Sequence, residues 1–221
     1  MNCRMGIIAL INQKGGAGKS TSSVHLAYWL QFKQNYRVLL VDADAQRSSS
    51  QWVAGMGIEL ACQVIQSPDD ILEKIPELIK DYDYLVIDGP ASLSEETRAI
   101  LFRCDLAVIP VQPTGVDLRS ASDAMRLLKQ AQSVRGGLPK GLVFLSRAVK
   151  NTKLKQEAIA LLSQIPDAKF LKPIIHQKQA IADTSGQSLT VWDLPGQAAS
   201  EAAIEYDRLF KAILKQLPEG V

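Results

Sequence analysis

Short apolar runs alternate along this chain with longer segments in which apolar residues recur at helical spacing. A short run that is apolar throughout is typical of a parallel strand buried on both faces of a sheet. The predicted strands are Gly6–Ile11, Arg37–Val41, Ala61–Ile65, Tyr84–Asp88, Leu106–Val111, Gly141–Leu145 and Lys169–Ile175. The strand at 61–65 is expected at an edge of the sheet.

The segments between these runs predict helices. They are a helix that begins near Gly18 and ends near Asn35, then Ser48–Ile58, Asp69–Lys80, Glu95–Phe102, Asp117–Gln132, Gln156–Leu162 and Ala198–Gln216. Ser67 is expected to cap the third helix with Pro68 at its first position, and Pro76 predicts a kink or a break. Strands that alternate with helices predict one doubly wound α/β domain over residues 1–221, with a mostly parallel sheet and helices on both faces.

Composition narrows the function classes. The chain has 221 residues and a formal net charge of +2, which is too small to indicate a nucleic-acid-binding protein by itself. Its three cysteines are scattered, which argues against a disulfide framework or a zinc site and favours the cytoplasm. No run approaches the ~20 apolar residues of a membrane span, and no signal peptide is expected. The first strand starts so early that no helix-turn-helix is expected before it.

The stretch Lys14–Thr21, KGGAGKST, lies between the first apolar run and the first predicted helix. Its glycines let backbone N–H groups turn towards a phosphate, and the start of the helix points its positive end at the same place. Lys19 can reach the β- and γ-phosphates of a nucleotide, and Ser20 can hold Mg²⁺. The strict phosphate-loop pattern requires glycine at position 13, where this chain has Gln13. The additional lysine, Lys14, is expected to point out of its own site.

Acidic residues follow two of the predicted strands. Asp42 and Asp44 come directly after Arg37–Val41, and Asp88 ends the run Tyr84–Asp88. The carboxyl ends of parallel strands are where open α/β sheets bind ligands. Asp88 at a strand tip is expected to bind Mg²⁺ through a water. Two alternatives stay open, since Asp44 could cap the following helix and a buried strand that ends in aspartate is common in unrelated folds.

Basic residues cluster late in the chain and are candidates for contacts with DNA phosphates. They are Lys150, Lys153 and Lys155 in a turn into a helix, followed by Lys169, Lys172 and Lys178. Arg147 stands at the end of the strand Gly141–Leu145, where it either contacts a bound nucleotide, braces a dimer or is simply solvated. The alternative for the lysines is likewise a solvated surface. His25 and His176 lack metal-ligand spacing and are expected at the surface or in helix packing.

The loop resembles the deviant phosphate loop KGGxGK[ST] of the ParA/MinD family of ATPases. The resemblance extends to VDADAQ at 41–46, where the family usually has DxDPQ and Ala45 replaces the proline, and to VIDGP at 86–90. It implies that residues 14–21, including Ala17, bind ATP, and that Lys14 contacts the nucleotide of a partner subunit. It also implies that Asp44 activates the attacking water and that Asp42 supports the Mg²⁺ shell. The loop around Pro113 is expected to approach the nucleotide and the dimer partner.

The same resemblance implies a function. Short ParA-type ATPases form an ATP-dependent sandwich homodimer, bind DNA without sequence preference, and segregate plasmids or chromosomes or position carboxysomes when an adaptor protein stimulates hydrolysis. The position of Lys178 resembles a basic site that ParA proteins use. This chain is therefore expected to be cytoplasmic and associated with the nucleoid, with no membrane partner. A membrane-surface ATPase of the MinD kind, or a metabolic phosphate-loop enzyme, remains the alternative.

Overall fold

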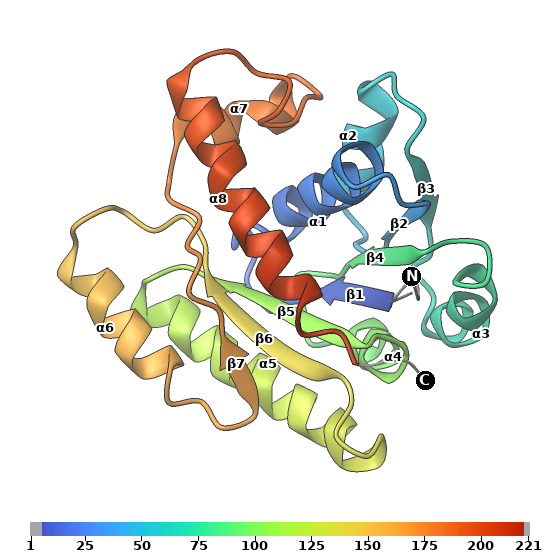
Figure 1. The fold of residues 1–221 in the computed structure, drawn as a ribbon. Coiled ribbons are helices and arrows are strands. Elements are labelled where there is room, and N and C mark those ends of the chain that lie inside the picture. The colour runs from blue at the N-terminus through green and yellow to red at the C-terminus, as the bar shows by residue number, and fades with distance from the viewer. Residues whose placement is uncertain (1–5, 219–221) are drawn as a thin grey trace.

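The computed structural model describes residues 6–218, apart from the side chains of residues 116, 117, 119 and 120. Strands and helices alternate along it, as the sequence predicts (Figure 1). The strands are β1 (Gly6–Leu10), β2 (Val38–Asp42), β3 (Ala61–Val64), β4 (Tyr84–Asp88), β5 (Leu106–Val111), β6 (Lys140–Leu145) and β7 (Ala168–Phe170). The helices are α1 (Lys19–Tyr28), continued by the π-helix η1 (Trp29–Lys33), then α2 (Ser48–Gly55), α3 (Pro68–Leu78), α4 (Glu95–Arg103), α5 (Gly115–Val134), α6 (Lys153–Leu162), α7 (Gln179–Gly186) and α8 (Gln197–Leu214).

The seven strands form one parallel sheet in the order β3-β2-β4-β1-β5-β6-β7. The predicted edge position of β3 is confirmed. β1 lies between β4 and β5, so the order along the sheet reverses direction beside it. In a doubly wound sheet such a switch point opens a crevice at the carboxyl ends of the strands, which is where a ligand site is expected.

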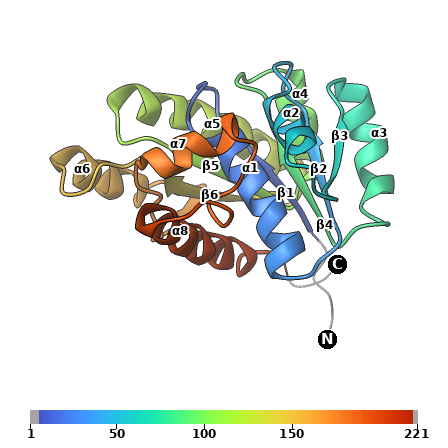
Figure 2. The same cartoon turned by 90° about the horizontal axis from the view of Figure 1, so that it is seen from above.

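Helices cover both faces of the sheet (Figures 1 and 2). Successive side chains of a strand point to opposite faces, so Ile7 and Ala9 of β1 pack with one buried cluster, whereas Ile8 and Leu10 pack with the other. The first cluster contains residues of α3, α4, α5 and α6, and the second contains residues of α1, α2 and α8. This two-sided burial is why the strands are almost uniformly apolar.

The structure corrects several predicted boundaries. The predicted strand 169–175 is wrong beyond Phe170, because Pro173 has no N–H to donate to the sheet. The break offered as one alternative at Pro76 is wrong as well, since α3 continues to Leu78. The predicted cap of this helix is confirmed, because Ser67 Oγ accepts the N–H of Asp70 at 3.5 Å. Helix α6 starts earlier than predicted, and α7 was not predicted.

Among the described residues, no helix is both long enough and apolar enough to cross a membrane.

Candidate nucleotide-binding site

A cavity of about 410 Å³ lies at the carboxyl ends of the strands. One wall is the loop between β1 and α1 together with the residues that follow β2, β4 and β6. The opposite wall comes from the segment around α7 and from one residue of α8. The lining residues are Gly15, Gly16, Gly18, Lys19, Ser20, Thr21, Asp44, Gln46, Ser48, Ala91, Ser146, Arg147, Ile175, His176, Gln177, Lys178, Gln179, Ile181, Ala182, Ser185 and Tyr206.

The loop before α1 is shaped by two glycines in the left-handed region, Gly16 at φ 75° and Gly18 at φ 96°. A side chain at Gly18 would also be excluded by space, because its Cβ would lie 2.7 Å from Ser146 Oγ. Residues that follow β5 and β6 hold this loop in place through hydrogen bonds. The Gly16 carbonyl accepts hydrogen bonds from Gln112 Nε2 at 2.7 Å and from Arg147 Nη1 at 3.0 Å.

The two lysines of this loop differ in environment. Lys19 is 5% exposed, and its Nζ donates to the backbone carbonyl of Lys14 at 3.2 Å. Burial lowers the pKa of Lys19, although Asp88 and Asp44 oppose that effect. An ammonium group held in such a loop is placed to bind an anion. Lys14 is half-buried and is not among the residues that line the cavity of its own chain.

Asp42 and Asp44 have different partners, although only one residue separates them. Both oxygens of the buried Asp42 accept backbone N–H groups, from Asp44 at 3.1 Å and from Ser50 at 2.8 Å. Ser50 lies in the first turn of α2, so Asp42 rather than Asp44 caps that helix. Asp44 lines the cavity and accepts the N–H of Ala91, beyond β4, at 3.2 Å.

Asp88 has an oxygen available for a cation. Its side chain is fully buried, Oδ1 accepts a hydrogen bond from Ser23 Oγ at 3.2 Å, and Oδ2 has no partner among the described residues. Burial raises the pKa of Asp88 to about 7, and the Asp42 carboxylate acts in the same direction. A buried carboxylate oxygen without a partner is costly, and a nearby cation removes that cost. These features fit Mg²⁺, which binds oxygen ligands and keeps several waters.

The remaining candidates of the site are only partly brought together. Arg147 reaches the loop and lines the cavity, whereas Pro113 is buried beside it and does not. The neighbouring Gln112 contacts the Gly16 carbonyl of the phosphate loop, and the expected approach of this segment to the nucleotide and the dimer partner stays a prediction. The wall formed by α7 and Tyr206 was missed. The sequence signal for this wall was the polar stretch 176–179 after a predicted strand. Helix α7 itself has one fully buried residue, Thr184, so it lacks the apolar stripe from which a helix is predicted.

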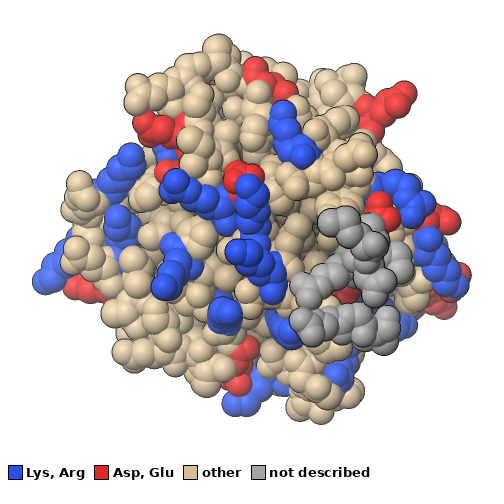
Figure 3. All heavy atoms as spheres, in the orientation of Figure 1, with Lys and Arg blue, Asp and Glu red and all other residues tan. Residues whose placement is uncertain are grey.

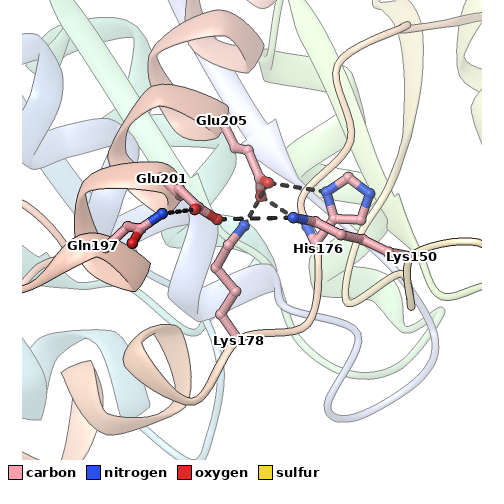
Figure 4. Close-up of polar contacts among 6 residues, drawn as sticks. All are labelled: Lys150, His176, Lys178, Gln197, Glu201 and Glu205. Carbon is pink, nitrogen blue, oxygen red and sulfur yellow. Dashed lines mark hydrogen bonds and ion pairs between the residues drawn. The ribbon is translucent and has the colours of Figure 1, made fainter.

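The basic candidates also occupy different environments. Lys150 is 61% exposed with Glu201 at 3.8 Å, and Lys153 is 89% exposed with Glu157 at 3.9 Å. Lys155 is half-buried at the start of α6. Lys178 is only 9% exposed, and its ammonium is paired with Glu205 of α8 (Figure 4).

Further exposed basic side chains lie on α8, at Arg208 and Lys211, and at its C-cap, Lys215. Lys169 of β7 adjoins them, because its Nζ donates to Gln216 Oε1 at 2.9 Å. We call these four residues the α8 strip. Figure 3 shows basic side chains gathered over the left and centre of this face, where Figure 1 places α6, β7 and α8.

Comparison with known proteins gives consistent matches. A family model described as the CobQ/CobB/MinD/ParA nucleotide binding domain matches residues 8–191. The chain is 38% identical over 213 residues to maintenance of carboxysome distribution protein A of Gloeobacter kilaueensis, with 92% of this chain and 91% of that protein covered. The protein of the same name from Halothiobacillus neapolitanus is 32% identical, with coverage of 94% and 95%.

Solved structures agree on the fold. The ATP complex of a variant of Cyanothece McdA superposes with a TM-score of 0.77 at 17% identity, with 99% of both chains covered. The MinD cell division protein of Aquifex aeolicus gives a TM-score of 0.75 at 20% identity, with 98% of this chain and 100% of that chain covered.

Proposed function

This chain belongs to the CobQ/CobB/MinD/ParA nucleotide-binding family, and we propose that it is a ParA-type ATPase that positions a cargo on DNA. In this proposal ATP joins two copies of the chain, the dimer holds DNA without sequence preference, and a cargo-adaptor protein stimulates hydrolysis and release. The carboxysome-distribution relatives, matched over more than nine-tenths of both chains, favour a carboxysome-like body over a plasmid or a chromosome. The chain would act as one domain, in the cytoplasm and at the nucleoid.

ATP and Mg²⁺ are the cofactors of this ATPase, and the residues of the cavity fit them. The N–H groups of residues 15–21 and the Lys19 ammonium would hold the phosphates, with Ser20 and Asp88 on the Mg²⁺ side. Mg²⁺ would neutralise phosphate charge when bound. Asp44 is the carboxylate that faces the cavity, so it would orient the attacking water, while Asp42 supports the acidic cluster and caps α2.

Dimerisation is proposed on the difference between the two lysines of the loop. Lys19 serves the cavity of its own chain, whereas Lys14 stands beside that cavity without lining it. In a dimer that faces two such cavities towards each other, Lys14 would neutralise phosphate charge in the partner's site. ATP would then favour the dimer because it binds the paired form better than the single chain.

Contact with DNA is proposed through exposed lysines and arginines. Lys150, Lys153 and Lys155 would contribute from the start of α6, and the α8 strip would extend the same basic face. Such contacts with phosphates release counterions, so binding would weaken steeply with salt and would not depend on sequence. Lys178 could take part only after it leaves Glu205.

The single observation that carries the proposal is the pair of lysines in one phosphate loop, and two substitutions test it. We expect Lys19→Ala to weaken binding of a fluorescent ATP analogue roughly 10- to 100-fold, because a charged contact with the phosphates is lost. Lys14→Ala should keep nucleotide binding but remain monomeric in sedimentation velocity with Mg-ATP. Equal loss of ATP affinity in both variants would contradict a role for Lys14 across the dimer.

A further inference from the structure

Glu205 of α8 binds three donors from one short segment. Its Oε2 accepts the backbone N–H of His176 at 2.9 Å, and its Oε1 lies 2.9 Å from His176 Nδ1 and also accepts Lys178 Nζ (Figure 4). All three side chains are largely shielded, with exposed fractions of 16% for Glu205, 19% for His176 and 9% for Lys178. The carboxylate therefore fixes both the backbone and the ammonium of residues 176–178.

The charge of Glu205 is maintained by these partners. Burial opposes its ionisation, but the hydrogen bonds from Lys178 and His176 outweigh burial, and the pKa of Glu205 lies below its ordinary value. Breaking a shielded pair of this kind costs far more than breaking a solvated one, since each charge is left without compensation. Lys178 is thus unavailable to any other anion while Glu205 holds it.

One turn earlier on α8, Glu201 forms a pair of the opposite kind. It faces Lys150 at 3.8 Å, and the two side chains are 41% and 61% exposed. Surface pairs of this type contribute little and exchange readily with other partners. Lys150 is therefore accessible to a large anion such as DNA, whereas Lys178 in the same structure is not.

The segment held by Glu205 is also a wall of the nucleotide cavity. His176, Gln177 and Lys178 line that cavity, and so does Tyr206, the residue next to Glu205. A nucleotide that fills the cavity contacts the same short segment. A shift of this wall away from α8 would move all three donors away from Glu205 together, because they come from a single stretch of backbone.

We propose that Glu205 is a latch that withholds Lys178 from DNA until nucleotide binding and dimerisation move residues 176–178 off α8. This inference rests on the proposed function, since it assumes that DNA is the anion that Lys178 meets after release. In this proposal the Glu205 carboxylate is the group that makes DNA binding depend on ATP.

Substitution of Glu205 tests the latch with the intact chain. Glu205→Gln keeps the shape and removes the charge, and Glu201→Gln removes the same charge one turn away as the matched control. Without nucleotide, Glu205→Gln should bind a random duplex more tightly than the control by roughly eightfold at 0.1 M salt, the effect of one extra phosphate contact. The gain should disappear when Lys178→Ala is added. Equal affinities of the two glutamine variants would overturn the latch.

A labelling measurement covers the case in which Glu205→Gln fails to fold. Brief acetylation of the wild-type protein, read by mass spectrometry, reports the accessibility of each lysine amine. Without nucleotide, Lys178 should react many times more slowly than Lys153, the 89% exposed reference, and it should gain reactivity with Mg-ATP. Equal reactivity of the two lysines without nucleotide, or no gain with Mg-ATP, would overturn the proposal.

Duplex binding distinguishes failure of the proposed function from failure of the Glu205 latch. A wild-type protein that binds duplex in no nucleotide state would remove the proposed function. A wild-type protein that binds duplex with Mg-ATP, while Glu205→Gln behaves like Glu201→Gln, would remove the latch alone.

Discussion

The buried histidine of α1 should make the fold sensitive to mild acid. His25 is fully buried, stacks on Tyr206 with ring centroids 4.7 Å apart, and has Nδ1 2.7 Å from the carbonyl of Thr21. The N–H of Val191 points at Nε2 from 3.2 Å, so Nε2 must accept and the ring is neutral with its proton on Nδ1. A second proton on Nε2 would face the Val191 N–H in a fully buried site.

Burial lowers the pKa of His25 from 6.5 to about 4. Below pH 6.5 the unfolded chain therefore binds a proton that the folded chain does not, and the free energy of unfolding falls as the pH falls, until the folded histidine also titrates near pH 4. A tenfold difference in proton affinity is worth about 1.36 kcal/mol, so the whole effect is about 3 kcal/mol, of which about 2 kcal/mol is lost between pH 7 and pH 5.

Urea denaturation at pH 7 and at pH 5 measures this loss, with His25→Gln as the comparison. Glutamine can donate and accept but does not titrate, so the carboxylates that also respond to acid contribute equally to both proteins. The wild type should lose about 2 kcal/mol more than the variant between the two pH values. If both lose the same amount, the neutral, buried histidine described above is refuted.

Three further substitutions follow from the structure. Asp44→Asn should leave ATP binding intact and slow phosphate release in single-turnover assays by roughly 100-fold, whereas unchanged release would exclude Asp44 from orienting the water. Gly89→Ala should lower the free energy of unfolding by about 1–3 kcal/mol in urea titrations, because its Cβ would lie 2.8 Å from the Leu10 carbonyl, and an unchanged midpoint would contradict that packing. Lys215→Glu on the α8 strip should weaken duplex binding and reduce its salt dependence. Lys74→Glu on α3, on the other side of the sheet, should weaken binding much less. Equal effects of the two substitutions would show that the α8 strip does not contact DNA.

The strands could be predicted from the sequence because their burial on both faces makes them apolar throughout. The phosphate loop and its flanking elements could also be predicted, since the glycines and lysines that shape the loop lie within one short stretch of sequence. Local sequence pointed to Lys19, Asp44 and Arg147 as site residues, and all three line the cavity. Their roles in binding and hydrolysis stay predictions.

Other features depend on contacts between distant segments. Asp42 and Asp44 both follow β2, and only the position of α2 shows that the second oxygen of Asp42 accepts a helical N–H while Asp44 faces the cavity. The sequence singles out Lys178 as a basic candidate, but only the packing of α8 shows that Glu205, 27 residues further along the chain, is paired with it. No local pattern encodes either fact.

Attachment to DNA is tested by duplex binding of the full chain at one fixed salt concentration, compared across Mg-ATP, Mg-ADP and no nucleotide. We expect much tighter binding to a random-sequence duplex with Mg-ATP than in the other two states, weakened as salt is raised and lost in Lys14→Ala, which is expected to remain monomeric. Binding that is equal in all three states, or absent from all three, would contradict an ATP-gated attachment to DNA.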